Sequence, residues 1–166
     1  MFVDANKDDV VEGRKLGVEL ICRVLQVAPS TYYAARAVLV GNYVLDPALY
    51  QQCISIDLAH TPVVFQDQSV VIGPRVTPGS GPCLHCVWEN AVSRAPHHQA
   101  VMSQLWRKLA PADTSEMALL ATTAVLELVT KAQRGRVLRI DALSHVVSER
   151  WEAPSNECRC RNIAVV

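Results

Sequence analysis

The spacing of apolar residues changes several times along the chain, and each change predicts a different element. Residues 4–15 are polar and carry charges of both signs. Residues 16–25 then bring apolar side chains every three to four positions, which predicts an amphipathic helix. The sequence Ala28-Pro29-Ser30 breaks this pattern, and Ser30 can cap a short helical turn after it. The start of the chain is therefore predicted to be helical.

The middle of the chain has the pattern of an α/β fold. An apolar run over 37–40 predicts a strand, and the chain then reaches Asp46. A proline in the first turn favours a helix over 47–58, where the apolar residues form a helical stripe. Two β-branched runs, which predict a hairpin, follow at 62–65 and 69–76.

The last part of the chain predicts helices followed by strands. Apolar residues at helical spacing predict short helices over 87–92 and 101–109. The segment 116–133 is apolar on nearly every helical face, so we expect this helix to be packed on several sides in the middle of the structure. Two final strands are predicted at 137–140 and 145–151. Strands alternating with helices place the chain in the α/β class.

Composition narrows the class of protein further. The 166 residues suffice for one ordinary domain with a real core, and half of them are hydrophobic. Lys and Arg together number 16, as do Asp and Glu, so no overall charge favours nucleic acid or anionic lipid. The sequence has no apolar run long enough to span a membrane, and its acidic, broken start does not resemble a secretory signal. We therefore expect a cytoplasmic protein.

Cysteine spacing is the most informative chemical signal. Cys83 and Cys86 form a Cys-x-x-Cys pair on a turn rich in Gly and Pro, and Cys158 and Cys160 form a second close pair near the end. Four thiolates in two short clusters are the ligand set of a structural zinc site. Six cysteines in a cytoplasmic chain are better explained as metal ligands or core thiols than as disulfides. Buried free thiols, or a redox pair at Cys83 and Cys86, remain open as alternatives.

The other chemical candidates have simpler explanations. Asp46 lies where a helix begins, His85 is expected on an exposed turn, and His97-His98 in a solvated loop. Cys22 and Cys53 fall on apolar helical stripes and are expected in the core. No Ser-His-Asp or Cys-His pattern of a hydrolase stands out. A local basic bias at the start of the chain could touch phosphate, but we do not expect DNA binding from so few residues: Arg14, Lys15, Arg23 and Arg36.

Two segments resemble known families. The sequence GVELICRVLQVAPSTYYAAR, within a match over about 2–36, resembles the start of insertion-sequence transposases with an integrase-like core. In those proteins a segment similar to VAPSTYYA precedes the catalytic domain. The rest of this chain does not resemble that catalytic domain, so the resemblance implies an N-terminal transposase-like segment without the catalytic domain.

Residues 37–160 are similar to the C-terminal half of ThiF-like adenylating proteins, and most of all to the branch of azole-forming cyclodehydratase or leader-peptide-binding proteins of bacteriocin-type peptide maturation. Three blocks carry the resemblance in the same order as in that branch: VVIGPRVTPGSGPCLHC at 70–86, TSEMALLATTAVLELV at 114–129 and RWEAPSNECRC at 150–160. The resemblance implies that Cys83, Cys86, Cys158 and Cys160 hold a structural zinc ion. The Cys-x-Cys spacing of the second pair is tighter than usual for zinc sites.

The resemblance also implies what the chain lacks. ThiF-like enzymes bind ATP at a Gly-rich turn between a strand and a helix. This sequence has no G-x-G-x-x-G and no Walker motif, and its seven glycines are scattered. We therefore expect no catalytic and no nucleotide-binding residues in this chain, and adenylation only if another chain supplies the nucleotide site.

Together these observations predict an α/β fold: the distal half of a Rossmann-like ThiF-type domain with a zinc-held C-terminal lobe (37–166), preceded by a short helical appendage (1–36). The leading hypothesis is a non-catalytic, zinc-stabilised module that binds a peptide or serves as a scaffold in ribosomal peptide maturation. The alternatives are a subunit of an ATP-dependent cyclodehydratase completed by a partner, and a transposase-derived DNA-binding protein. A halved sheet leaves an open edge, so we expect self-association or a protein or peptide partner.

Overall fold

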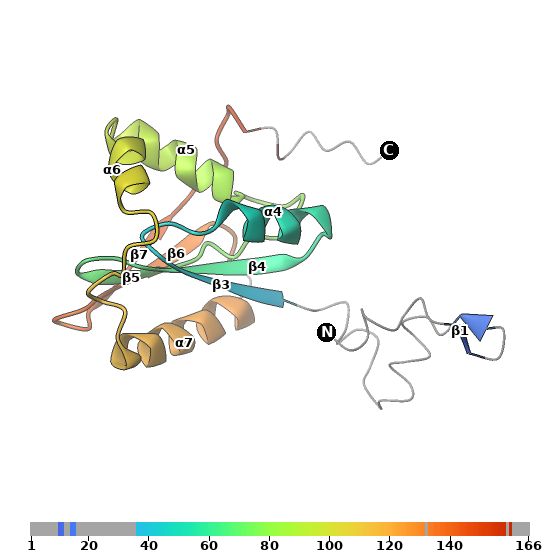
Figure 1. Cartoon of the computed structure of the whole chain (residues 1–166), viewed down its shortest axis with the longest axis horizontal. Coiled ribbons are helices and arrows are strands. Elements are labelled where there is room, and N and C mark those ends of the chain that lie inside the picture. Colours follow the sequence, from blue (N-terminus) through green and yellow to red (C-terminus); the bar gives the residue numbers. More distant parts are fainter. Residues whose placement is uncertain (1–9, 12–13, 16–35, 132, 159, 161–166) are drawn as a thin grey trace. The chain divides into compact units, whose positions relative to one another are not determined.

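The computed structural model describes residues 10–11, 14–15, 36–131, 133–158 and 160 (Figure 1). The chain divides into two compact units, Met1–Ala35 and Arg36–Val166. In the first unit, β1 (Val10–Val11) pairs antiparallel with β2 (Arg14–Lys15). The helix predicted over 16–25 and most of the transposase-like segment lie outside the described residues.

The second unit begins with two parallel strands joined by a helix. β3 (Arg36–Asn42) leads into α4 (Pro47–Ser55), and β4 (Ala59–Phe65) returns beside β3 with Val40 opposite Val63. The Asp46 carboxylate accepts a hydrogen bond from the Ala48 backbone N–H at 2.9 Å and thus caps the helix. The predicted role of Asp46 at a helix start is confirmed.

The remaining strands extend the same sheet antiparallel. β5 (Ser69–Ile72) forms a hairpin with β4, as the sequence predicts, and pairs with β6 (Arg136–Asp141). β7 (Val147–Trp151) pairs with β6, so the strand order is β3-β4-β5-β6-β7. The fold is therefore mixed α/β, with one parallel pair in a sheet that is otherwise antiparallel.

Helices cover the two faces of the sheet differently. α7 (Ser115–Thr130) lies on one face, whereas α4, α5 (Leu84–Arg94) and α6 (His98–Gln104) lie on the other (Figure 1). The main core lies between α7 and the sheet. Its buried residues come from α7, from three strands and from the loop that precedes α7: Val63, Phe65, Val70, Ile72, Ala110, Met117, Ala121, Ala124, Val125, Leu128, Leu138 and Ile140.

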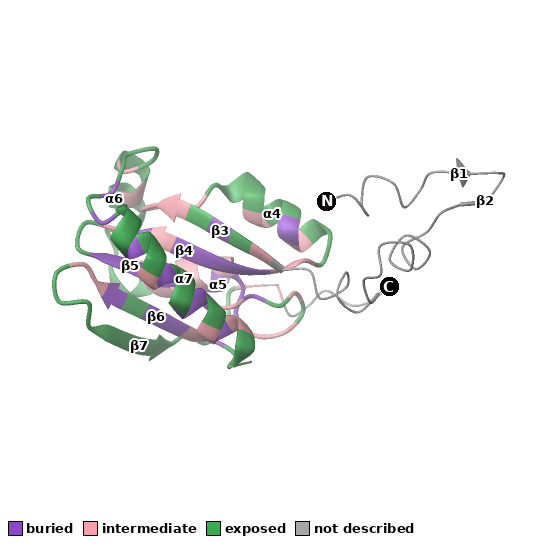
Figure 2. Ribbon diagram, turned by 90° about the horizontal axis from the view of Figure 1, so that it is seen from below, coloured by how far each residue is buried: buried purple, intermediate pink, exposed green. Residues whose placement is uncertain are grey.

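The prediction that the most apolar helix is packed on several sides is wrong. Leu119 and Leu126 of α7 are 69% and 60% exposed, and the outward side of the helix faces solvent in the second unit (Figure 2). The sequence could not reveal this, because leucines on the packed and unpacked sides have the same hydropathy. α7 therefore covers the sheet with one face only.

β3 forms one end of the sheet within the described residues. Val38 and Val40, which alternate toward the α7 side of β3, are 48% and 59% exposed. At the other end, every residue of β7 is exposed, so both of its faces are wet rather than the single one that its alternation suggests. No helix in the described part of the chain is long and apolar enough to cross a membrane.

Candidate metal centre

The first cysteine pair lies at the start of α5. Cys83 is the residue that precedes the helix, with extended backbone angles, and Cys86 lies in the first helical turn. Because a Cys-x-x-Cys pair at a helix start spans one turn, its two side chains fall on the same side. The two Sγ atoms are 3.7 Å apart. The local structure thus aims two thiols at one point.

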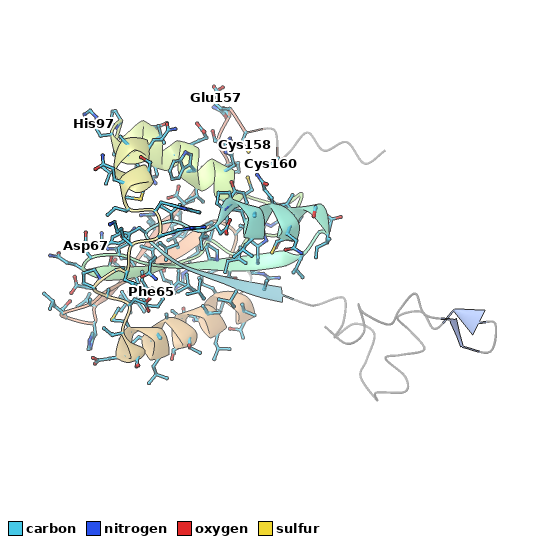
Figure 3. All side chains as sticks on the ribbon, viewed as in Figure 1. Phe65, Asp67, His97, Glu157, Cys158 and Cys160 are labelled. Atoms are coloured by element: carbon cyan, nitrogen blue, oxygen red, sulfur yellow. The ribbon has the colours of Figure 1, made fainter. Side chains whose placement is uncertain are left out.

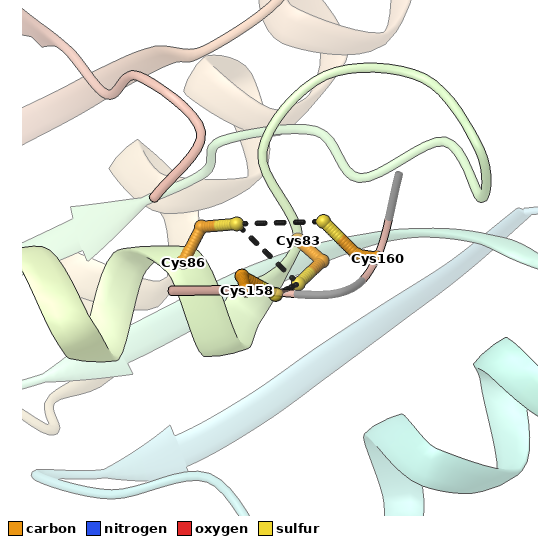
Figure 4. A group of neighbouring side chains, drawn as sticks. All are labelled: Cys83, Cys86, Cys158 and Cys160. Carbon is orange, nitrogen blue, oxygen red and sulfur yellow. Dashed lines mark hydrogen bonds between the residues drawn. The ribbon is translucent and has the colours of Figure 1, made fainter. Parts of the chain in front are cut away.

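The second pair reaches the same point from the far end of the chain. After β7, the chain crosses to the side of the sheet that carries α4 and α5, where Figure 3 labels Cys158 and Cys160. The Sγ of Cys158 is 3.5 Å from that of Cys83, and the Sγ of Cys160 is 3.5 Å from that of Cys86 (Figure 4). The structure therefore brings together all four of the cysteines singled out in the sequence.

The spacing of the sulfurs fits a tetrahedral metal ion. All four Sγ atoms lie within 4.8 Å of one another. A Zn–S bond of ~2.3 Å in a tetrahedron places neighbouring sulfurs about 3.8 Å apart, close to the observed separations. A disulfide needs a separation of about 2.05 Å, so none of these cysteines is paired with another in that way. The cluster can hold a metal ion that four thiolates bind.

The thiols of the cluster differ in pKa, and ionising all four together is unfavourable without a cation. Burial raises the pKa of the Cys83 thiol to about 11, and burial together with the neighbouring thiols raises that of Cys160. Burial acts in the same direction on Cys86, but backbone hydrogen bonds with Ser155 and Cys83 outweigh it and lower its pKa. Four negative sulfurs in one partly buried cluster repel one another, and a divalent cation at their centre would remove that cost.

The other sequence candidates do not belong to the cysteine cluster. His85 lies in the first turn of α5 rather than in a turn outside a helix, but its side chain is 53% exposed, as expected, with Nε2 at 3.6 Å from the Glu89 carboxylate. Cys53 is buried in α4, as expected. His98 is not in a loop: it begins α6, and its ring makes an edge contact with Trp88 at a centroid distance of 5.1 Å.

Sequence reasoning missed a buried carboxylate at the other end of α5 from the cysteine cluster. The Glu152 side chain is only 1% exposed, accepts hydrogen bonds from Arg94 at 2.9 Å and from Asn90 at 3.1 Å, and forms an ion pair with Arg150 at 3.0 Å. Its backbone N–H donates to the Gly135 carbonyl at 2.7 Å. Glu152 thus ties the second half of α5 to the segment that carries the second cysteine pair. Nothing in its neighbouring residues signals this, since two of its partners lie on a helix far earlier in the chain.

Replacing Glu152 by glutamine is expected to lower the free energy of unfolding by about 1–2 kcal/mol at neutral pH. The effect is moderate because Arg94 and Arg150 are themselves about half exposed. Burial alone raises the pKa of Glu152, but Arg94, Asn90 and Arg150 outweigh it and lower that pKa. A carboxyl group with a lowered folded-state pKa stabilises above its unfolded pKa of about 4.3, and that stabilisation is lost as the pH falls through the folded value.

The difference between the wild type and Glu152→Gln in urea unfolding should therefore shrink below about pH 4. The matched control is Glu149→Gln, since the Glu149 side chain is 52% exposed and pairs with Arg136. It should cost less than about 1 kcal/mol. Equal losses in the two variants would contradict the importance of the buried carboxylate.

Comparison with solved structures shows which fold this is. The chain is similar to a chain of the E. coli microcin synthetase McbBCD complex, with a TM-score of 0.57 at 13% sequence identity, over 73% of this chain and 52% of that one. It is also similar to a heterocyclase in complex with substrate and cofactor, with a TM-score of 0.51 at 9% identity, over 96% of this chain and 30% of that one. E. coli MccB bound to succinimide gives a TM-score of 0.47 at 15% identity, over 76% and 40%.

The chain therefore spans about half or less of the length of these solved chains. The similarity shows that the chain shares the fold of part of the microcin synthetase and heterocyclase chains. No protein-family profile matches the sequence, and no curated protein matches it. The transposase-like start stays a prediction.

Proposed function

We propose that this chain is a zinc-stabilised module of ThiF-like fold that binds a peptide during ribosomal peptide maturation and carries out no adenylation by itself. The observation that carries the proposal is the closed set of four sulfurs. Zinc sites that catalyse keep a coordination position for water or substrate, whereas four protein ligands fill a structural site. Zinc at Cys83, Cys86, Cys158 and Cys160 would thus hold the fold together rather than perform chemistry.

The comparisons support the biological setting of the proposal. The microcin synthetase and the heterocyclase are proteins named for synthesis and ring formation, and the heterocyclase was solved with a substrate. The shared fold makes peptide maturation the setting to test first.

The open end of the sheet favours a second candidate, a subunit completed by another chain. Val38 and Val40 are exposed on β3, whose outer edge is unpaired within the described residues. A parallel pair of strands normally lies inside a sheet that is covered on both faces. A partner that adds strands beside β3 could supply a nucleotide site with the Gly-rich motif that this sequence does not contain, and ATP binding only in the presence of such a partner would favour this candidate.

The leading candidate is tested by selection from a phage-displayed library of random dodecapeptides against the zinc-loaded full chain. We expect enrichment of related peptides that bind in solution with micromolar affinity. The control selection uses the Cys158→Ser chain, which should enrich none of them because the proposed zinc site is broken. Failure to enrich any peptide on the zinc-loaded chain would overturn the peptide-binding function.

A further inference from the structure

A cavity of about 550 Å³ lies between α5 and the sheet, on the face opposite α7. Its floor is formed by side chains that alternate to this face from neighbouring strands, among them Val64 of β4 and Val71 of β5. Its roof is one stripe of α5 at helical spacing: Leu84, Val87, Trp88 and Ala91. These roof residues take no part in the main core. Two apolar walls thus face each other across a space of the size that small ligands and peptide side chains occupy.

One end of this cavity is cationic. Arg139 of β6 and Arg150 of β7 line it from adjacent strands, where the residues opposite them are Ser148 and Val137. Their diagonal positions on one face bring the two guanidinium groups within reach of one ligand. Arg94 of α5 lines the cavity from above. None of the described residues that line the cavity is acidic.

The carboxylates that interact with these arginines do not cancel their charge, because the two carboxylates Glu152 and Asp141 face three arginines. Glu152 forms ion pairs with both Arg94 and Arg150, so its single negative charge neutralises only one of these two positive charges. In the part of the chain that the structure describes, Arg139 has no carboxylate within ion-pair distance, although its charge helps to lower the pKa of Asp141 on the same strand. His98 also lines the cavity, and burial, followed by the charge of Arg94, lowers its pKa and so favours the neutral ring. The positive charge of this end therefore comes from the arginines. The cavity therefore combines apolar walls with an excess of positive charge.

We propose that this cavity binds an acidic segment of a peptide, in which a large apolar side chain lies between α5 and the sheet and a neighbouring carboxylate pairs with Arg139 and Arg150. Guanidinium groups bind carboxylates through paired, charge-assisted hydrogen bonds, which gives such a site its preference for acid over amide. This inference rests on the proposed peptide-binding function and names the site and the chemistry of the peptide.

The test is fluorescence anisotropy of the zinc-loaded full chain with a labelled octapeptide of alternating aspartate and leucine. We expect saturable binding, and binding about tenfold weaker or worse for the octapeptide that carries asparagine in place of aspartate. Arg139→Gln should weaken binding of the acidic peptide by about the same factor, because it removes the guanidinium that forms no ion pair within the described residues. Ala91→Trp should abolish binding by filling the cavity.

Lys108→Gln is the matched control, since Lys108 is exposed and does not line the cavity. It removes one positive charge and should leave binding unchanged. Circular dichroism and the melting temperature show whether each variant is folded. Equal binding of the two octapeptides, or binding that neither Arg139→Gln nor Ala91→Trp changes, would overturn the inference. If phage selection enriches peptides that ignore both variants, the proposed function stands without this site; if neither selection nor the acidic octapeptide gives binding, both are wrong.

Discussion

Purified chain is expected to contain one zinc ion, and removal of that ion by a chelator should unfold most of the second unit. The reason is the size of the metal's contribution. Structural zinc contributes an apparent ~10–16 kcal/mol in small sites, whereas a whole domain has a net stability of about 5–15 kcal/mol. Cys158→Ser should accordingly lose the metal and about 5 kcal/mol or more of its free energy of unfolding. Metal analysis, together with thermal melting before and after chelation, measures both effects.

Cys53→Ser provides the control for this experiment. Cys53 is a buried cysteine of α4 that does not belong to the four-sulfur cluster. Its serine variant should keep one zinc ion per chain and lose only a small part of the stability. A well-folded wild type without zinc, or a chelator that leaves the melting temperature unchanged, would exclude the metal and leave buried free thiols as the explanation of the cluster.

Leu128→Ala is expected to lower the free energy of unfolding by about 2–5 kcal/mol. Leu128 is 1% exposed on the packed side of α7, within the main core. Its truncation leaves a cavity between the helix and the sheet, where the surrounding side chains relax only partly. Urea unfolding at neutral pH with zinc present measures the loss.

The same helix offers a control with the same substitution. Leu126 is 60% exposed, so Leu126→Ala removes an equal number of atoms from solvent-facing surface. It should change the stability by no more than about 0.5 kcal/mol. A large loss in Leu126→Ala as well would show that the outer side of α7 is covered in solution, for example by a second copy of the chain.

Local patterns were enough to predict most elements of the second unit. Each of these signals can be recognised from a few neighbouring residues: the proline and aspartate at the start of α4, the β-branched runs of β4 and β5, and the two cysteine pairs. The cysteine cluster could be predicted across a long separation because four thiolates have few other uses in a chain of this kind.

Features that depend on distant neighbours could not be predicted in this way. The buried position of Glu152 requires Arg94 from another element, and the sequence around Glu152 does not reveal that partner. The cavity depends on how far α5 lies from the sheet, which no periodicity encodes. One signal was present, however: Arg139 and Arg150 lie on strands whose pairing places both on one face. Once the strand register is known, a cationic surface on that face follows.

The roof of the cavity depends on the last part of the described chain. α5 is tied to it at both ends, by Cys83 and Cys86 in or just before the first turn and by the hydrogen bonds of Asn90 and Arg94 to Glu152 near the last. The metal would thus set the height of α5 above the floor of the cavity. If metal and peptide both favour the same position of this helix, each must raise the affinity for the other by the same factor. The zinc site and the peptide site would then form one thermodynamic unit.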